Sequence, residues 1–378
     1  MDMLFGTIFF ICPMRLAESG APATLVSGII IAWAVPYIIA NQFLGHLVTT
    51  KNAVNMLIGS SIALSVNSLF FILFPGPLMQ YVWVIVSGVA GAFFFAPFQT
   101  FMKSFETGSA GVIRSTGLYT FAWSFGLACG PFVSGPVWEK FGWKYCHVLN
   151  VIIGLLCLAG IFLLSKVRTS KHRHRDDGVE AKEEISNYAG MRDFAWVGWI
   201  GSGAGCLVIS IIRGVFPKTA TEYGLKVADS GLALALVSFS QAFTGLLLCF
   251  GRTWMYKPVP VGLLGLCGVV SSVLFGYGST TFTYCLAAIL FGIYSGGFFF
   301  YLVFHSLVHP SKSARYIAVN EMVVGLGGIC GPIVGGMLSD KVGLGMPYYF
   351  SALLIGAAVL IQVIVHSRKN DAKNFRRS

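Results

Sequence analysis

Glu321 is the residue best placed for chemistry, because it is a carboxylate within a long apolar stretch. Helical spacing puts it on one stripe with Gly325, Gly328 and Pro332, and such small residues face protein or a cavity rather than lipid. An ionisable group costs roughly 2.5 to 3.5 kcal/mol when its segment crosses a membrane, so the few that occur are candidate functional residues. This carboxylate could exchange a proton or pair with a cationic substrate. The plainer alternative is a structural pairing with Arg315 or with another basic residue at the inner end.

Four further polar residues lie in comparable apolar stretches. The guanidinium of Arg213 could attract an anionic group, or could extend to the polar interface near the end of its helix. Gln241 lies in the middle of its segment and Asn320 adjoins Glu321, so each could bind a substrate or hydrogen-bond a neighbouring helix. Thr120 occupies the position that matches Glu321 when the chain is aligned with itself. These residues complete the set of candidate substrate or coupling groups.

Catalytic and metal-binding patterns do not stand out. H-E-x-x-H, G-x-S-x-G and phosphate-binding loops do not occur. His172 and His174 lie among Lys and Arg residues that repel cations, which favours a solvated basic segment over a metal site. The nine cysteines form no C-x-x-C pair and mostly lie in apolar stretches, where they act as small apolar residues. We therefore expect no enzyme, no metal and no cofactor.

Composition determines the class of protein. With 56% hydrophobic and 11% charged residues and a mean hydropathy of +0.76, the chain cannot be a water-soluble globule. Apolar stretches of about 20 residues recur, enough to cross roughly 30 Å of hydrocarbon as helix, so we predict an all-α polytopic membrane protein. The net charge of +11 does not indicate nucleic acid, because most of the 26 Lys and Arg residues fall in segments on one side of the predicted topology. By the positive-inside rule, both termini are expected to be cytoplasmic.

An internal repeat organises the chain. Arg114–Trp143 matches Arg315–Leu344 without a gap at two flanking basic positions, a Cys, a Pro and several Gly, with Glu139 opposite Asp340. Each copy contains G-x-x-x-G-P-x-x-x-G, in which glycines four apart let helices approach closely and the proline favours a bend. The pattern is open to two interpretations, tight packing alone or a role in conformational change. The residues concerned are Gly117, Gly126, Gly130, Pro131, Gly135, Gly327, Gly331, Pro332 and Gly336.

The same duplication covers twelve predicted helices, six in each half and in the same orientation. We expect an N-terminal six-helix bundle over 1–166, a cytoplasmic linker over 167–192, a second bundle over 193–367 and a basic tail over 368–378. The first apolar block, Leu4–Pro13, is too short to span, whereas its counterpart begins near Phe194. We therefore expect that the chain lacks the beginning of its first helix. The other spans are predicted at about 24–44, 53–74, 78–102, 114–143, 145–164, 194–216, 230–250, 259–277, 282–305, 315–338 and 347–366.

The chain resembles the major facilitator superfamily. The resemblance covers its whole length through the six-plus-six layout and implies movement of a substrate by rocking of two bundles about a central site. The fifth predicted helix is similar to the superfamily pattern G-x8-G-x3-G-P-x2-G-G, with Ser134 in place of the first of the final glycines. The continuation F-G-W-K at 141–144 is similar to the common F-G-W-R. The residues that match the helix pattern are Gly117, Gly126, Gly130, Pro131 and Gly135.

Two departures from the family pattern bear on mechanism. The loop motif G-x-L-x-D-R-x-G-R is present only as residues 45–51, without its Asp and its Arg pair. Val84 occupies the fourth-helix position at which proton-driven drug exporters have an arginine. The first departure removes the residues of the family's usual inner gate, and the second argues against a drug:proton exchanger.

The sequence therefore predicts a monomeric secondary transporter that moves a small organic solute across the cell (inner) membrane by alternating access. The expected partners are the solute, the lipid bilayer and, as a hypothesis that involves Glu321, a proton; nucleic acid is not expected. A facilitative uniporter and a drug exporter remain alternatives within transporters. A receptor or scaffold that keeps this fold but does not transport is the alternative from another class.

Overall fold

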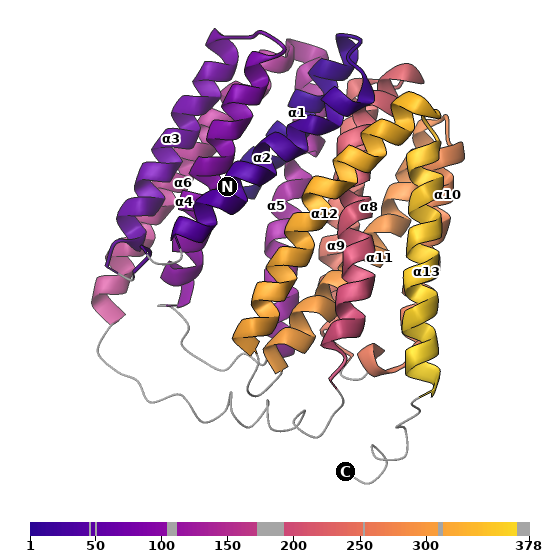
Figure 1. Cartoon of the computed structure of the whole chain (residues 1–378). Helices are drawn as coiled ribbons and strands as arrows, with labels where there is room; N and C mark the ends of the chain where they lie inside the picture. Colours follow the sequence, from indigo (N-terminus) through magenta and orange to yellow (C-terminus); the bar gives the residue numbers. More distant parts are fainter. Residues whose placement is uncertain are drawn as a thin grey trace.

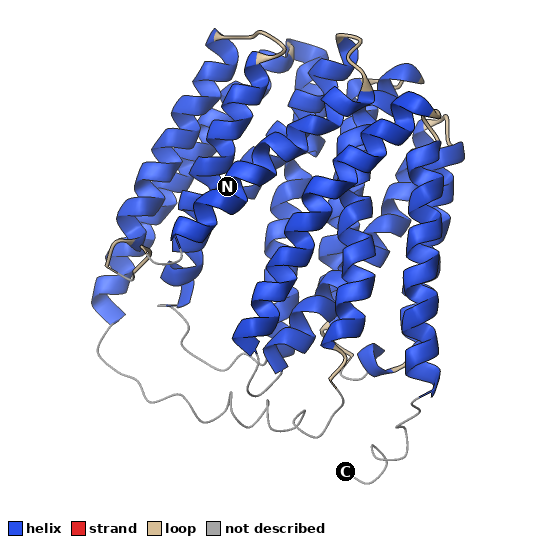
Figure 2. Ribbon diagram, viewed as in Figure 1, coloured by secondary structure: helices blue, strands red, loops and turns tan. Residues whose placement is uncertain are grey.

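The computed structural model describes residues 1–44, 47–49, 51–103, 112–171, 193–251, 254–308 and 313–368. Over these residues the chain folds into twelve α-helices and one short 3-10 turn, with no strand (Figure 2). Ten of the helices are long and apolar enough to cross a membrane. The prediction of an all-α, polytopic membrane protein is confirmed.

The helices form two sets of six that lie side by side, α1 to α6 and α8 to α13 (Figure 1). The first set comprises α1 Asp2–Glu18, α2 Ala23–Leu44, α3 Ala53–Leu73, α4 Met79–Lys103, α5 Val112–Phe141 and α6 Trp143–Lys171. The second comprises α8 Ala195–Glu222, α9 Val227–Leu248, α10 Pro258–Tyr277, α11 Thr281–Val308, α12 Ser313–Lys341 and α13 Met346–Arg368, with the 3-10 turn η1 at Trp254–Tyr256.

The connections divide the molecule into two ends. The short turns that join α1 to α2, α3 to α4 and α5 to α6, with their three counterparts in the second set, lie at one end, which we call the turn end (Figure 1). The opposite end, where α6 finishes and α8 begins, is called the linker end. The predicted linker and tail fall largely on 172–192 and 369–378, outside the described residues.

Two helices continue past a proline near which the sequence predicts their end. The first continues through Pro13 to Glu18, and its counterpart α8 continues through Pro217 to Glu222. A proline within a helix removes only one backbone hydrogen bond, and both prolines are buried against neighbouring helices that hold the last turn in place. The prediction that these helices end near Pro13 and Pro217 is therefore wrong.

The repeated glycines of α5 and α12 pack against the first helix of their own half. A Cβ on Gly126 would lie 2.7 Å from the side chain of Asp2 in α1, and one on Gly130 would overlap the backbone of Gly6. In the second half, Gly327 and Gly331 meet the backbone of α8 in the same way. The close approach of backbones is the means by which helices associate in lipid, where apolar burial gives little gain.

A different face of the same two helices packs against the other half. Gly135 of α5 contacts Ala228 of α9, and Gly336 of α12 contacts Thr24 of α2. We call these two contacts between halves the α5–α9 seam and the α2–α12 seam. Their residues occupy equivalent positions in the repeat, so the two halves meet through paired, pseudo-symmetric seams.

We predict that Gly130→Ala lowers the free energy of unfolding by about 1–3 kcal/mol, because the added methyl group has to displace backbone rather than a flexible side chain. Thermal unfolding of the purified protein in detergent measures this. Gly160→Ala is the matched control, since a Cβ there meets nothing within 4 Å. Equal melting temperatures for the two variants would contradict the packing assigned to Gly130.

Candidate functional site

Glu321 lies on the stripe of α12 that faces α2. Further along that stripe, Gly325 packs on Ile38, and the hydroxyl of Ser27 donates to the carbonyl oxygen of Pro332 at 2.9 Å. The predicted stripe therefore faces α2 at Gly325 and Pro332, whereas a Cβ on Gly328 would meet nothing within 4 Å. Glu321 itself is exposed, and within the described part of the chain it forms no hydrogen bond and no ion pair, Arg315 included.

Glu321 belongs to the second half, but the polar groups around it come from the first. It is close enough to interact electrostatically with the phenol groups of Tyr37 in α2 and Tyr119 in α5, and Asp2 of α1 interacts with the same two phenols. Gln99 of α4 hydrogen-bonds the hydroxyl of Tyr119. We call these five residues the Glu321 cluster.

The cluster is accessible, and it is lined by aromatic side chains. Tyr119 is 54% exposed, and Gln99 is exposed as well. The ring of Trp33 stacks on Tyr37 with 4.5 Å between centroids, and Phe95 meets the edge of Tyr37 at 6.3 Å. Aromatic faces beside a carboxylate provide both apolar contact and a site for positive charge. Sequence reasoning missed Trp33, Tyr37 and Tyr119, since nothing in the order of residues separates a ring that faces lipid from one that faces another helix.

The side chain of Arg213 contacts a helix of its own half. It is half-buried in α8, and its guanidinium donates to the hydroxyl of Ser238 in α9 at a long 3.4 Å. The helix continues for nine residues to Glu222, so this side chain does not extend to the end of its helix. No acid pairs with Arg213 among the described residues.

Arg213 and Glu321 lie at different depths. Arg213 is nine residues from the turn end of α8, and Glu321 is twenty residues from the turn end of α12. At 1.5 Å per residue the two Cα atoms are separated by roughly 16 Å along the bundle. The two charges therefore lie at different levels of the bundle, with Glu321 nearer the linker end.

Gln241 and Thr120 contribute to the α5–α9 seam. The Gln241 amide donates to the hydroxyl of Ser124 at 2.7 Å, and its carbonyl oxygen accepts from Ser295 at 2.9 Å, so it joins α9 to α5 and α11. Thr120 is buried against Gly245 of the same seam. Both side chains are therefore engaged between helices and are not free to contact a solute in this conformation.

Asn320 is bonded on both sides of its amide. Its oxygen accepts from the indole of Trp199 in α8 at 2.9 Å, and its nitrogen donates to the hydroxyl of Ser306 at 2.7 Å and to the carbonyl of Leu302 at 3.3 Å. These bonds fasten α12 to α8 and α11. Although adjacent in sequence, Asn320 and Glu321 thus face in different directions.

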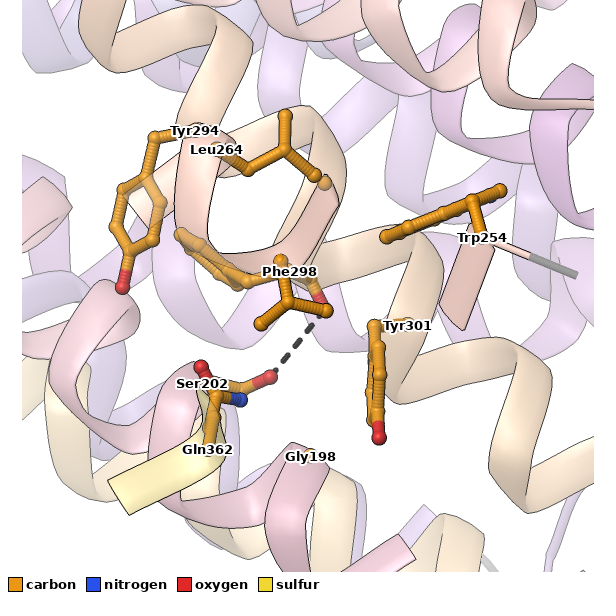
Figure 3. A pocket seen from close by; sticks show the side chains of 10 residues that line it. Gly198, Ser202, Trp254, Leu264, Tyr294, Phe298, Tyr301 and Gln362 are labelled. Carbon is orange, nitrogen blue, oxygen red and sulfur yellow. Dashed lines mark hydrogen bonds between the residues drawn. The ribbon is translucent and has the colours of Figure 1, made fainter. Parts of the chain in front are cut away.

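A small pocket lies elsewhere, inside the second half. Tyr294, Phe298 and Tyr301 of α11 line it together with Ser202 of α8 and Gln362 of α13 (Figure 3). The hydroxyl of Ser202 donates to the carbonyl of Phe298 at 3.3 Å. All of these residues belong to one half, so this pocket is separate from the Glu321 cluster.

Metal ligands do not gather in the described part of the chain. His172 and His174 lie outside the described residues. His305 and His309 are four apart, the spacing of two ligands on one helix face, but His309 is also outside the described residues. The expected absence of a metal site and of a cofactor stays a prediction.

Two six-helix halves, joined in parallel and holding an accessible carboxylate between them, define a membrane protein of the transporter class. The family model of the Major Facilitator Superfamily matches residues 1–305 and 198–377. The chain therefore belongs to the Major Facilitator Superfamily, a superfamily of transporters rather than enzymes.

Solved structures agree on the fold. The structure described as that of the nucleoside transporter NupG is similar, with a TM-score of 0.63 over 97% of this chain and 95% of that chain, at 13% sequence identity. At that identity the likeness establishes the fold alone. No curated protein matches this sequence.

We predict that Gln241→Leu destabilises the protein by about 1–3 kcal/mol, because it leaves the buried hydroxyl of Ser124 without its partner and leaves Ser295 only the carbonyl of Gly292. Thermal unfolding tests this, with Gln42→Leu as the control because Gln42 is exposed and lies outside the Glu321 cluster. If instead the Gln241 variant keeps its melting temperature and loses only solute binding, then Gln241 is a substrate ligand.

Proposed function

We propose that this protein moves a small organic solute across the cell (inner) membrane by alternating access between its two halves. The observation that supports this best is Glu321, an exposed and unpaired carboxylate at the place where the two halves separate. A charge at that depth is expensive unless it finds a partner. Because the described residues offer none, the partner is a proton or the transported solute.

The orientation follows from charge. The linker end is the cytoplasmic end, because α6 and α13 end there and the basic residues of 166–175 and 368–377 lie at or after those helix ends in the sequence. Glu321 lies eight residues inside the first residue of α12, or roughly 12 Å from that end. The conformation is therefore one in which the Glu321 cluster is reached from the cytoplasm.

The solute is one that suits a carboxylate flanked by aromatic rings, that is, a flat or cationic organic molecule with hydrogen-bonding groups. Nucleosides belong among the compounds to be tried, since the similar structure is that of a nucleoside transporter. Arg213 lies roughly 16 Å further toward the turn end and becomes a second contact for an acceptor group as the solute moves outward.

Proton coupling through Glu321 gives a direct prediction. Glu321→Gln removes the proton-binding group and keeps the shape of the side chain, so uptake driven by a pH gradient into proteoliposomes is expected to fall at least tenfold, while exchange of labelled for unlabelled solute continues. Glu18→Gln is the control, an exposed acid at the turn end. Unchanged pH dependence in the Glu321 variant would leave a facilitative uniporter as the mechanism.

The solute class is found by thermal shift. A ligand that binds only the folded protein raises the melting temperature. At a concentration of one hundred times its Kd, it increases the free energy of unfolding by about 2.7 kcal/mol. We expect stabilising compounds among cationic or flat polar molecules, and we expect the shift to shrink in Glu321→Gln. A panel of nucleosides, organic amines and organic acids checks this, and stabilisation by organic acids alone would place the site at Arg213 instead.

The same ligand separates a transporter from a receptor with this fold. A transporter exchanges bound labelled solute for unlabelled solute across the vesicle membrane, whereas a receptor binds it without exchange. Counterflow in proteoliposomes distinguishes the two classes.

A further inference from the structure

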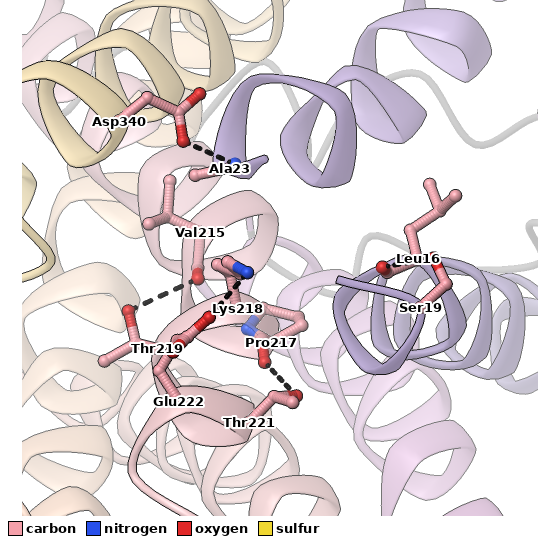
Figure 4. A network of polar contacts seen from close by, with 10 residues as sticks. All are labelled: Leu16, Ser19, Ala23, Val215, Pro217, Lys218, Thr219, Thr221, Glu222 and Asp340. Carbon is pink, nitrogen blue, oxygen red and sulfur yellow. Dashed lines mark hydrogen bonds and ion pairs between the residues drawn. The ribbon is translucent and has the colours of Figure 1, made fainter. Parts of the chain in front are cut away.

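Two further contacts join the halves at the turn end, away from the Glu321 cluster. Asp340 at the end of α12 accepts hydrogen bonds from the backbone N–H groups of Ala23 at 2.7 Å and Thr24 at 2.9 Å, the first two residues of α2 (Figure 4). Glu139 at the end of α5 accepts from the backbone N–H of Ala228, the second residue of α9, at 2.9 Å. Each acid thus binds the start of a helix in the opposite half.

The two contacts are equivalent by the internal repeat. Glu139 and Asp340 are 201 positions apart, and Thr24 and Ala228 are 204 apart, in keeping with the offsets of the helices to which they belong. A pair of like contacts related by the pseudo-twofold axis is a property of the interface, and is not expected of an incidental surface contact.

The helices that receive these acids have no cap of their own. The residue before α9 is Lys226, which makes no side-chain capping bond, and the residue before α2 is Pro22, whose side chain has no acceptor. Helix starts usually satisfy their free N–H groups with a Ser, Thr, Asp or Asn at this position. In this protein the acceptor comes from the other half, and the positive end of the helix dipole adds to the attraction.

We propose that Asp340 and Glu139 form a double latch that holds the turn end closed. When the halves separate at this end, each acid leaves its helix start, and the N–H groups of α2 and α9 lose their acceptors. The latch therefore favours the conformation that is closed at the turn end, whichever solute is carried. Asp340 and Glu139 are positioning residues for the conformational step and do not contact the Glu321 cluster.

Other groups near the latch are arranged to support it. Lys218 of α8 interacts electrostatically with Asp340 and pairs with Glu222 at 2.6 Å (Figure 4). One turn before Asp340, Gly336 lets α12 approach Thr24 of α2 closely. One turn before Glu139, Gly135 lets α5 approach Ala228 of α9 in the same way. The acids thus act at the point where the seams are already tight.

The test measures the distance between the halves at the turn end, independently of transport. Spin labels on bio-orthogonal residues at Leu78 and Ser279, in the α3–α4 and α10–α11 turns, report that distance by pulsed electron resonance without involving the native cysteines. In the wild type we expect one short distance. In Asp340→Ala/Glu139→Ala a longer distance is expected to gain population by about tenfold, the effect of losing about 1.4 kcal/mol of capping.

A second pair of substitutions separates the latch from simple helix capping. Pro22→Ser and Lys226→Ser, added to the double alanine variant, give α2 and α9 caps of their own without joining the halves. We expect these caps to restore the melting temperature while the longer distance persists. If they also restore the short distance, or if the double alanine variant keeps the wild-type distance, the latch is wrong.

Glu18→Ala/Asp229→Ala is the matched control. Both acids lie at the turn end, but Asp229 accepts from Thr281 within its own half at 3.0 Å, and Glu18 is exposed. The control is expected to show the wild-type distance. Should the double alanine variant not yield folded protein, Asp340→Ala and Glu139→Ala are measured singly, each with the opposite seam intact, and an unchanged distance in both again rejects the proposal.

Discussion

The close approach of backbones along α5 and α12 is the constraint on which the rest of this structure depends. One face of each helix meets the first helix of its own half through Gly130 or Gly331, and another face meets the opposite half through Gly135 or Gly336. Larger side chains would separate these helices and remove the van der Waals contact that holds membrane helices together. Two glycine-rich helices therefore hold each half together and also join the halves.

The seams differ in a way that suits a transporter. The α5–α9 seam is closed over its described length, from Gly245 and Gln241 near the linker end to Ala228 at the turn end. In the α2–α12 seam the packing contacts begin at Gly325, and Glu321 is left exposed beyond them. The position that is a buried Thr120 in one seam is thus an accessible acid in the other, and the symmetry of the repeat is broken where chemistry is needed.

Much of the fold could be predicted from the sequence, because the length of the apolar segments and the internal repeat are both visible in the order of residues. The stripe of Glu321 was also predicted correctly, since helical spacing alone places it on the face with Gly325 and Pro332. The partners of Gln241 and Asn320 could not be predicted, because they lie on other helices and the spacing says only that a polar group has to find one. Proline misled at Pro13 and Pro217, where neighbouring helices keep the final turn intact.

The crossed helix caps have a bearing on how such a chain arises. In a dimer of identical six-helix units with a twofold axis, the acid of each unit would cap the partner's second helix. The two hydrogen bonds would then be equivalent by symmetry. Asp340 and Glu139 keep that reciprocal arrangement within one polypeptide, with side chains that now differ by one methylene group. The architecture thus has the form of a self-complementary association between two like six-helix units, held within one chain.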